Sequence, residues 1–214
     1  MKHTYLILGA CLTASGAAWA LSPDDFSTDH AQISVTSSAG PANSDSSWVA
    51  APGTVGGFRQ LGLAGGTGTG AETMTTEIAG GSWDASFDAG ITGTYFASVL
   101  YSDTNGDTSF NTPIDLSQGG TQDRLTLTIS SLVAGDGSSC PQISIQLRDS
   151  DSSDEQYRYP CMAGDVEWLY SSFSGIDFTE VEQLIVRVYG FSNLALDVSA
   201  ASLTPVDLMQ FSID

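Results

Sequence analysis

Basic residues are scarce in this sequence. Lysine and arginine together account for 6 of the 214 residues, against 25 aspartates and glutamates, and the net charge at pH 7 is −19. A polyanion of this kind is repelled by nucleic acids and by anionic lipid surfaces, because both carry dense negative charge. We therefore expect no nucleic-acid partner.

Histidine and cysteine are also scarce, with 2 and 3 copies. A hydrolase triad of serine, histidine and an acid needs an imidazole beside its nucleophile. Beyond residue 20 the only histidine is His30, which lies in a polar region where we expect a solvated loop. So few imidazoles and thiols also disfavour zinc sites and cysteine nucleophiles.

Long hydrophobic runs are absent. The apolar stretch 5–12 follows Lys2 and precedes Ala-Trp-Ala at residues 18–20, a small-residue site of the kind that signal peptidase cleaves. The stretch is too short to cross a bilayer. We predict that residues 1–20 are a signal peptide, that no integral membrane span remains after processing, and that the protein is secreted or extracellular, with the periplasm or cell surface as alternatives. Another alternative is lipidation of Cys11, which ends a lipobox-like sequence.

Two cysteines remain after residue 20, Cys140 and Cys161. An even number of cysteines in an exported chain favours a disulfide, because the compartment is oxidising. We predict that these two residues form a structural cross-link. Closing a loop of roughly 20 residues would stabilise the fold by about 3 kcal/mol.

Apolar and polar residues alternate along most of the chain, and helical periodicity is hard to find. This alternation predicts strands at Ile33–Thr36, Phe58–Leu63, Met74–Ile78, Trp83–Phe87, Tyr95–Tyr101, Leu125–Ser130, Ile143–Arg148, Leu184–Tyr189, Leu194–Ser199 and Met209–Ile213. So many short strands predict an all-β protein with a single antiparallel β-sandwich, and favour the jelly-roll arrangement.

The N-terminal part of the mature chain differs in composition from the rest. Residues 21–50 are rich in Ser, Asp and Ala, and we interpret them as a polar lead-in that can add an edge strand at Gln32–Thr36. Residues 51–214 are predicted to form the β-sandwich domain. The glycine-rich segment 65–70 lacks the lysine of a phosphate-binding loop and is interpreted as a turn.

Two segments carry a resemblance. Residues 56–61 (Gly-Gly-Phe-Arg-Gln-Leu) and residues 172–184 resemble segments of a broad group of uncharacterised exported bacterial proteins, and residues 172–184 also resemble strand beginnings in jelly-roll carbohydrate-binding modules. The resemblance covers roughly residues 50–214 and implies one sandwich. It implies that the following side chains fill the core: Phe173, Phe178, Val181 and Leu184.

A cluster of oxygen-bearing side chains makes calcium the one cofactor to consider. Asp103, Asn105 and Asp107 stand at alternate positions around Gly106, and hard cations take oxygen ligands from such turns. The alternative is a loop in which Asp and Asn serve turn chemistry alone. A second acidic loop, residues 149–155, is a weaker candidate.

Aromatic residues provide the candidate binding face. Tyr157 and Tyr159 alternate along one segment, and Trp168 follows nearby. Flat apolar rings stack on the C–H faces of sugar rings while neighbouring polar groups meet the hydroxyls. We therefore predict these three residues as contacts for a polysaccharide or surface glycan, with core packing as the alternative, above all for Trp168.

Three functions are open at this point. The first is a non-enzymatic secreted or cell-surface protein that binds glycans weakly. The second is a structural subunit that self-associates by donating its lead-in strand to a neighbour. The third is a polysaccharide-degrading enzyme with paired acids, for which Asp165 with Glu167 and Glu180 with Glu182 are the candidates.

Overall fold

The computed structural model describes residues 22–37, 43–133, 140–190 and 192–205. These residues form twelve strands and one short 3₁₀ helix: β1 (His30–Thr36), β2 (Ser44–Ala50), β3 (Phe58–Thr67), β4 (Thr73–Ala79), β5 (Ser82–Phe87), β6 (Thr92–Ser102), β7 (Gln122–Val133), β8 (Gln142–Arg148), β9 (Ser153–Arg158), β10 (Gly164–Leu169), η1 (Tyr170–Ser172), β11 (Gln183–Tyr189) and β12 (Leu194–Pro205). The predicted signal peptide, Cys11 and the predicted strand Met209–Ile213 lie outside the described residues.

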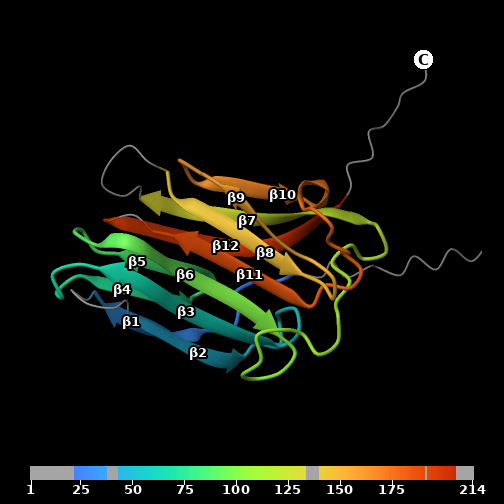
Figure 1. Cartoon of the computed structure of the whole chain (residues 1–214), viewed down its shortest axis with the longest axis horizontal. Coiled ribbons are helices and arrows are strands. Elements are labelled where there is room, and N and C mark those ends of the chain that lie inside the picture. Colours follow the sequence, from blue (N-terminus) through green and yellow to red (C-terminus); the bar gives the residue numbers. More distant parts are fainter. Residues whose placement is uncertain (1–21, 38–42, 134–139, 191, 206–214) are drawn as a thin grey trace, which may run out of the picture.

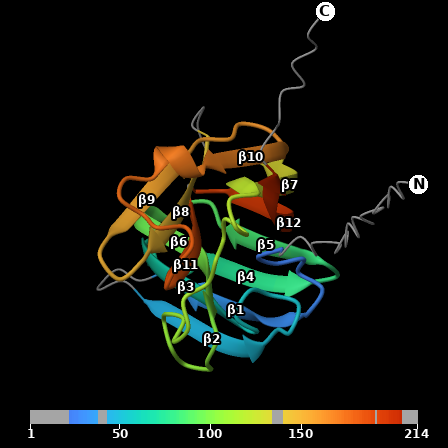
Figure 2. The same cartoon turned by 90° about the vertical axis from the view of Figure 1, so that its right-hand side faces the viewer.

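The strands form two antiparallel sheets of six. Sheet A has the order β1-β4-β5-β12-β7-β10, and sheet B has the order β2-β3-β6-β11-β8-β9. Figure 2 shows them as two layers, with sheet B on the left and sheet A on the right. In both views β1 and β2 lie at one end of the sandwich and β9 and β10 at the other (Figures 1 and 2). The predicted all-β sandwich is confirmed.

The connectivity of β5–β12 is that of a jelly roll. β5 pairs with β12, β6 with β11, β7 with β10, and β8 with β9, as in one long hairpin. This hairpin is rolled up so that β12 also pairs with β7, and β11 with β8. Eight strands wound in this way make the two Greek keys of a jelly roll. The first four strands extend it, with β4 and β1 added to sheet A and β3 and β2 to sheet B.

The core lies between the sheets and consists of the inward-facing member of each alternating pair. Trp83 and Phe87 of β5, for example, are about 1% exposed. Of the residues that the resemblance places in the core, Phe173, Val181 and Leu184 are buried, and Phe178 is partly buried against the core. Alternation therefore predicts the buried face of β5, and the resemblance predicts the core side chains of residues 173–184.

Residues 22–37 and 43–50 pack as part of the sandwich. The edge strand expected at Gln32–Thr36 is present as the larger part of β1, and an unpredicted strand, β2, forms the edge of the other sheet. Asp24 and Arg59 form an ion pair of 2.6 Å with both side chains fully buried, which fastens this segment to β3. His30 is 5% exposed, so the expectation that it lies in a solvated loop is wrong.

Candidate functional site

The outer faces of the two sheets differ in chemistry. On sheet A, alternation turns Ser, Thr, Asp and Glu outward, and no aromatic residue of its described strands faces solvent on that side. On sheet B the outward positions of the described parts of β6, β11, β8 and β9 include aromatic, glutamine and serine side chains, and Glu155 is the one acid among them. Sheet B therefore offers the surface better suited to a polar, ring-bearing ligand.

Three aromatic rings form a row across sheet B. Phe96 of β6 stands directly opposite Tyr189 of β11, and their ring centroids are 5.7 Å apart. Tyr157 of β9 lies on the other side of Tyr189, with the ring centroids 6.3 Å apart. The row therefore joins three strands that the roll of the chain brings together, although residues 96 and 157 are far apart in sequence.

A carboxylate lies at the polar centre of this row. Oε1 of Glu155 accepts hydrogen bonds from Ser144 Oγ at 2.6 Å, Arg187 Nη1 at 3.0 Å and Tyr189 Oη at 3.2 Å. Oε2 accepts a hydrogen bond from Tyr157 Oη at 2.8 Å. Burial raises the pKa of Glu155, but the hydrogen bonds from Ser144 and Tyr157 and the charge of Arg187 outweigh it, so the pKa lies below its ordinary value. Glu155 is therefore an ionised acceptor at neutral pH.

Arg187 links the carboxylate to the rings. Its Nη2 donates to Oε1 of Gln146 at 2.7 Å, and its guanidinium carbon lies 5.8 Å from the centroid of the Phe96 ring. The side chains of Arg187 and Glu155 are 18% and 23% exposed. The pair is thus partly shielded from water, and the two charges compensate each other.

A shallow hollow of about 360 Å³ lies beside Phe96, over β2, β3 and β6. The residues that line it come from the three strands and include one carboxylate: Ser44, Asp45, Ser46, Gly62, Leu63, Ala64, Phe96 and Ser98. In the sheet, Gly62 is paired with Ser98 and Ala64 with Phe96. A ligand lying on the Phe96 ring can therefore approach the backbone of β3 closely.

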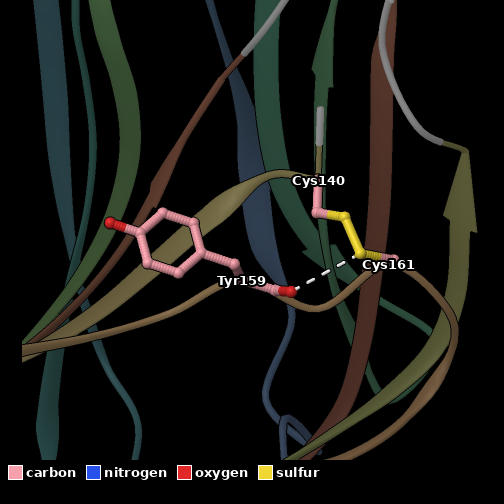
Figure 3. Close-up of a disulfide and its surroundings, with 3 residues drawn as sticks. All are labelled: Cys140, Tyr159 and Cys161. Carbon is pink, nitrogen blue, oxygen red and sulfur yellow. Dashed lines mark hydrogen bonds between the residues drawn. A yellow bond between two sulfur atoms is a disulfide. The ribbon is translucent and has the colours of Figure 1, made fainter. Parts of the chain in front are cut away.

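The two predicted tyrosines have different surroundings. Tyr157 is 37% exposed and belongs to the aromatic row. Burial and the neighbouring Glu155 carboxylate raise the pKa of Tyr157 to about 12. Tyr159 follows the end of β9 and is 61% exposed. Figure 3 shows its ring pointing away from the predicted disulfide between Cys140 and Cys161, which is present in the structure.

Trp168 does not join the tyrosines. It stands opposite Leu125 in sheet A, is 0% exposed, and its ring nitrogen donates to the backbone oxygen of Gln156 at 3.0 Å. The prediction that Trp168 contacts a ligand is wrong, because both faces of a fully buried ring are covered by protein. The alternative interpretation, core packing, holds for it.

The predicted calcium loop is held by its own hydrogen bonds. Oδ1 of Asp103 accepts from the Asn111 backbone N–H at 2.9 Å, and Oδ2 accepts from the Thr112 N–H at 2.9 Å. The side-chain amide of Asn111 also donates to Asp107 Oδ2 at 3.3 Å. Within the described residues, no group of three or more His, Cys, Asp or Glu side chains is arranged to hold a metal ion. Calcium binding by Asp103, Asn105 and Asp107 stays a prediction.

Carboxylates dominate the other sheet. Glu77, Asp84 and Asp197 come from three adjacent strands of sheet A, in register with one another, and line a common hollow. Burial, together with the charges of Asp197 and Glu77, raises the pKa of Asp84. Sequence reasoning missed this row, because no local pattern shows that β12 lies beside β5.

The acid pairs singled out in the sequence are engaged elsewhere. Asp165 accepts a hydrogen bond from Thr128 Oγ1 at 2.7 Å, and Glu167 forms an ion pair with Arg124 at 3.1 Å. Glu180 and Glu182 come before β11, at the end of a turn. None of these four carboxylates lies on the aromatic face.

Comparisons with known proteins give distant likenesses. No family model matches the chain, and no curated protein matches it in sequence. The structure of PfGH50B is similar at 13% identity and a TM-score of 0.38, covering 62% of this chain and 21% of that chain, so the chain spans about a fifth of that protein. The solution structure of CtCBM11 is similar at 12% identity and a TM-score of 0.43, covering 86% and 94% of the two chains.

A third structure, of carbohydrate-binding modules from the β-sandwich superfamily, is similar at 10% identity and a TM-score of 0.33, covering 75% of this chain and 56% of that chain. β-Sandwich carbohydrate-binding modules are thus among the structural neighbours. At these TM-scores the likeness carries no argument about what the chain binds. Within the described ranges, no helix has the length and apolar character that crossing a bilayer requires.

Proposed function

We propose that this chain is a non-enzymatic protein of the cell exterior that binds glycans on the outer face of sheet B. The observation that carries the proposal is the row of Phe96, Tyr189 and Tyr157 beside the polar cluster around Glu155. Aromatic rings meet the apolar faces of sugars, and hydroxyl and amide groups meet their polar edges. No equivalent row exists on the described part of sheet A.

The shape of the face favours a chain-like ligand over a small enclosed one. The rings lie on three strands, β6, β11 and β9, so a ligand contacting all of them runs across the strands. The hollow beside Phe96 continues this path over β3 and β2. Because the surface is open and much of it stays hydrated, we expect weak binding that increases with the number of sugar units contacted.

Affinity electrophoresis in gels containing soluble polysaccharides tests the proposal. A double variant, Phe96→Ala with Tyr157→Ala, should lose two stacking contacts of about 0.5–1.5 kcal/mol each, which weakens binding by about fivefold to 150-fold. The matched control is Leu169→Ala, which removes a 41% exposed apolar side chain from β10 of sheet A and should bind as the wild type does. Unchanged retardation of the double variant would contradict the proposal.

The two other functions predict different results. A self-associating subunit should form concentration-dependent polymers that deletion of residues 21–40 abolishes, although β1 is already paired with β4 of the same chain.

A polysaccharide-degrading enzyme should release sugars. The acid row on sheet A is where its chemistry would lie, so turnover lost in Asp84→Asn would replace the proposal.

A further inference from the structure

We infer that the glycan bound by this face is uncharged. Glu155 sets this preference by accepting hydrogen bonds from the hydroxyl groups of its neighbours, whose protons are then not available to a ligand. The inference rests on the proposed function. It deepens that function, because it names the class of sugar that the same site accepts and the residue that discriminates.

The first step is a count of protons. A hydroxyl group has one proton to donate and two lone pairs to accept with. Ser144, Tyr157 and Tyr189 each donate their proton to Glu155. An ionised carboxylate only accepts, so it returns no proton to them. Ser144 is fully buried, so toward a ligand it is the oxygens of Tyr157 and Tyr189 that present lone pairs.

The second step concerns what a ligand must bring. A sugar hydroxyl or an acetamido N–H can donate to these lone pairs, so neutral sugars complement them. A uronate or sulfate group offers acceptor oxygens alone, and it would place lone pairs and negative charge against lone pairs. A desolvated polar group that finds no partner weakens binding about tenfold or more.

The third step concerns positive charge. Arg187 is the cation at the centre of the row, and it lies 3.0 Å from Glu155, which compensates its charge. The other arginine that alternation places on this face, Arg148, lies at the end of β8, opposite Ser153 and Gln183. An acidic sugar at the rings thus meets an ion pair that carries no net charge. The protein as a whole, with a net charge of −19, repels such a sugar.

The experiment compares sugars that differ only at C6. Cellohexaose, laminarihexaose and mannohexaose are each titrated against the protein, beside the hexamer in which every C6 hydroxyl is oxidised to a carboxylate. The titrations are repeated in about 1 M NaCl, where the Debye length is about 3 Å and repulsion by the whole protein is screened. We expect any neutral hexamer that binds to do so about tenfold or more tightly than its uronate partner, in both salt conditions.

The variant Glu155→Gln isolates the role of the carboxylate. Its amide can donate as well as accept, so the neighbouring hydroxyl groups can turn their protons toward a ligand. In high salt, the ratio of the affinity for the neutral hexamer to that for its uronate partner should then be close to one. The matched control is Glu167→Gln, which removes one negative charge from sheet A, where Glu167 pairs with Arg124. This control should keep the wild-type preference in high salt, so a change confined to Glu155→Gln cannot come from net charge.

The outcomes separate the inference from the function on which it rests. A uronate that binds the wild type as tightly as its neutral partner in high salt overturns the inference and leaves glycan binding in place. An undiminished preference in Glu155→Gln rejects the part assigned to Glu155. If that variant fails to fold, Tyr157→Phe with Tyr189→Phe replaces it, since removing both hydroxyl acceptors should also reduce the preference. If no hexamer and no polysaccharide binds, the proposed function fails and the inference fails with it.

Discussion

The burial of His30 makes the free energy of unfolding depend on pH, and a substitution of this one residue separates its contribution from that of the carboxylates. His30 begins β1, and its Nε2 lies 2.7 Å from Ser47 Oγ of β2, while Nδ1 has no hydrogen-bond partner among the described residues. Burial, with a smaller contribution from the charge of Arg59, lowers the pKa of His30 from 6.5 to about 4. The imidazole is therefore neutral in the folded protein at a pH at which the unfolded chain has already bound a proton.

The sign and size of the effect follow from this difference in pKa. Between pH 6.5 and about 4 the unfolded state binds more protons than the folded state, so the free energy of unfolding falls as the pH falls. The slope is at most about 1.4 kcal/mol per pH unit, and the whole window amounts to about 3 kcal/mol. Below the folded pKa both states are protonated, and this contribution changes no further.

Urea unfolding of the wild type and of His30→Gln, at constant ionic strength, measures the effect. The glutamine amide can still reach Ser47 but does not titrate, and the many carboxylates titrate alike in both proteins. Between pH 7 and pH 4.5 the wild type should lose about 2 kcal/mol more stability than the variant. Parallel stability curves over this range would show that the imidazole is not held neutral by burial, and the reasoning would fail.

Three further predictions concern the scaffold. Asp24→Asn leaves the fully buried Arg59 without its carboxylate and should lower the free energy of unfolding by about 3–5 kcal/mol in urea titrations; a loss below 1 kcal/mol would contradict it. Replacing Cys140 and Cys161 by serine opens a loop with a sequence separation of 21 and should cost about 3 kcal/mol, whereas equal melting temperatures would argue against it. If the predicted calcium loop binds tightly, added calcium raises the melting temperature and Asp103→Asn removes the increase; a melting temperature unmoved by metal and by chelator rejects the site.

Most of the fold was predictable from the sequence, because alternation reports which strands have a buried face. It located nine of the twelve described strands, and β2, β9 and β10 were not among the predicted ones. The first four residues of β2, Ser-Asp-Ser-Ser, contain nothing apolar to bury. An edge strand of this kind forms through backbone pairing with β3, and no side-chain pattern announces it.

The site was predictable only in part. Tyr157 stood out as an aromatic residue in an alternating segment, but Glu155 belonged to what was interpreted as an acidic loop. Phe96 and Tyr189 belong to strands whose alternation was recognised, yet alternation does not reveal that β11 lies between β6 and β8. The same limit explains Trp168, since a strand pattern defines two faces without showing which one is covered.

The distribution of charge between the sheets bears on how such an acidic protein can contact another molecule. On sheet A, Glu77 and Asp197 stand directly opposite Asp84, and like charges in such cross-strand positions destabilise a sheet. On sheet B the acid at the centre of the outer face is matched by Arg187 and by three hydroxyl donors. At the aromatic row, the negative charge of Glu155 is therefore compensated by the protein's own side chains. A neutral ligand can approach there without displacing a counterion, so its affinity should depend little on salt.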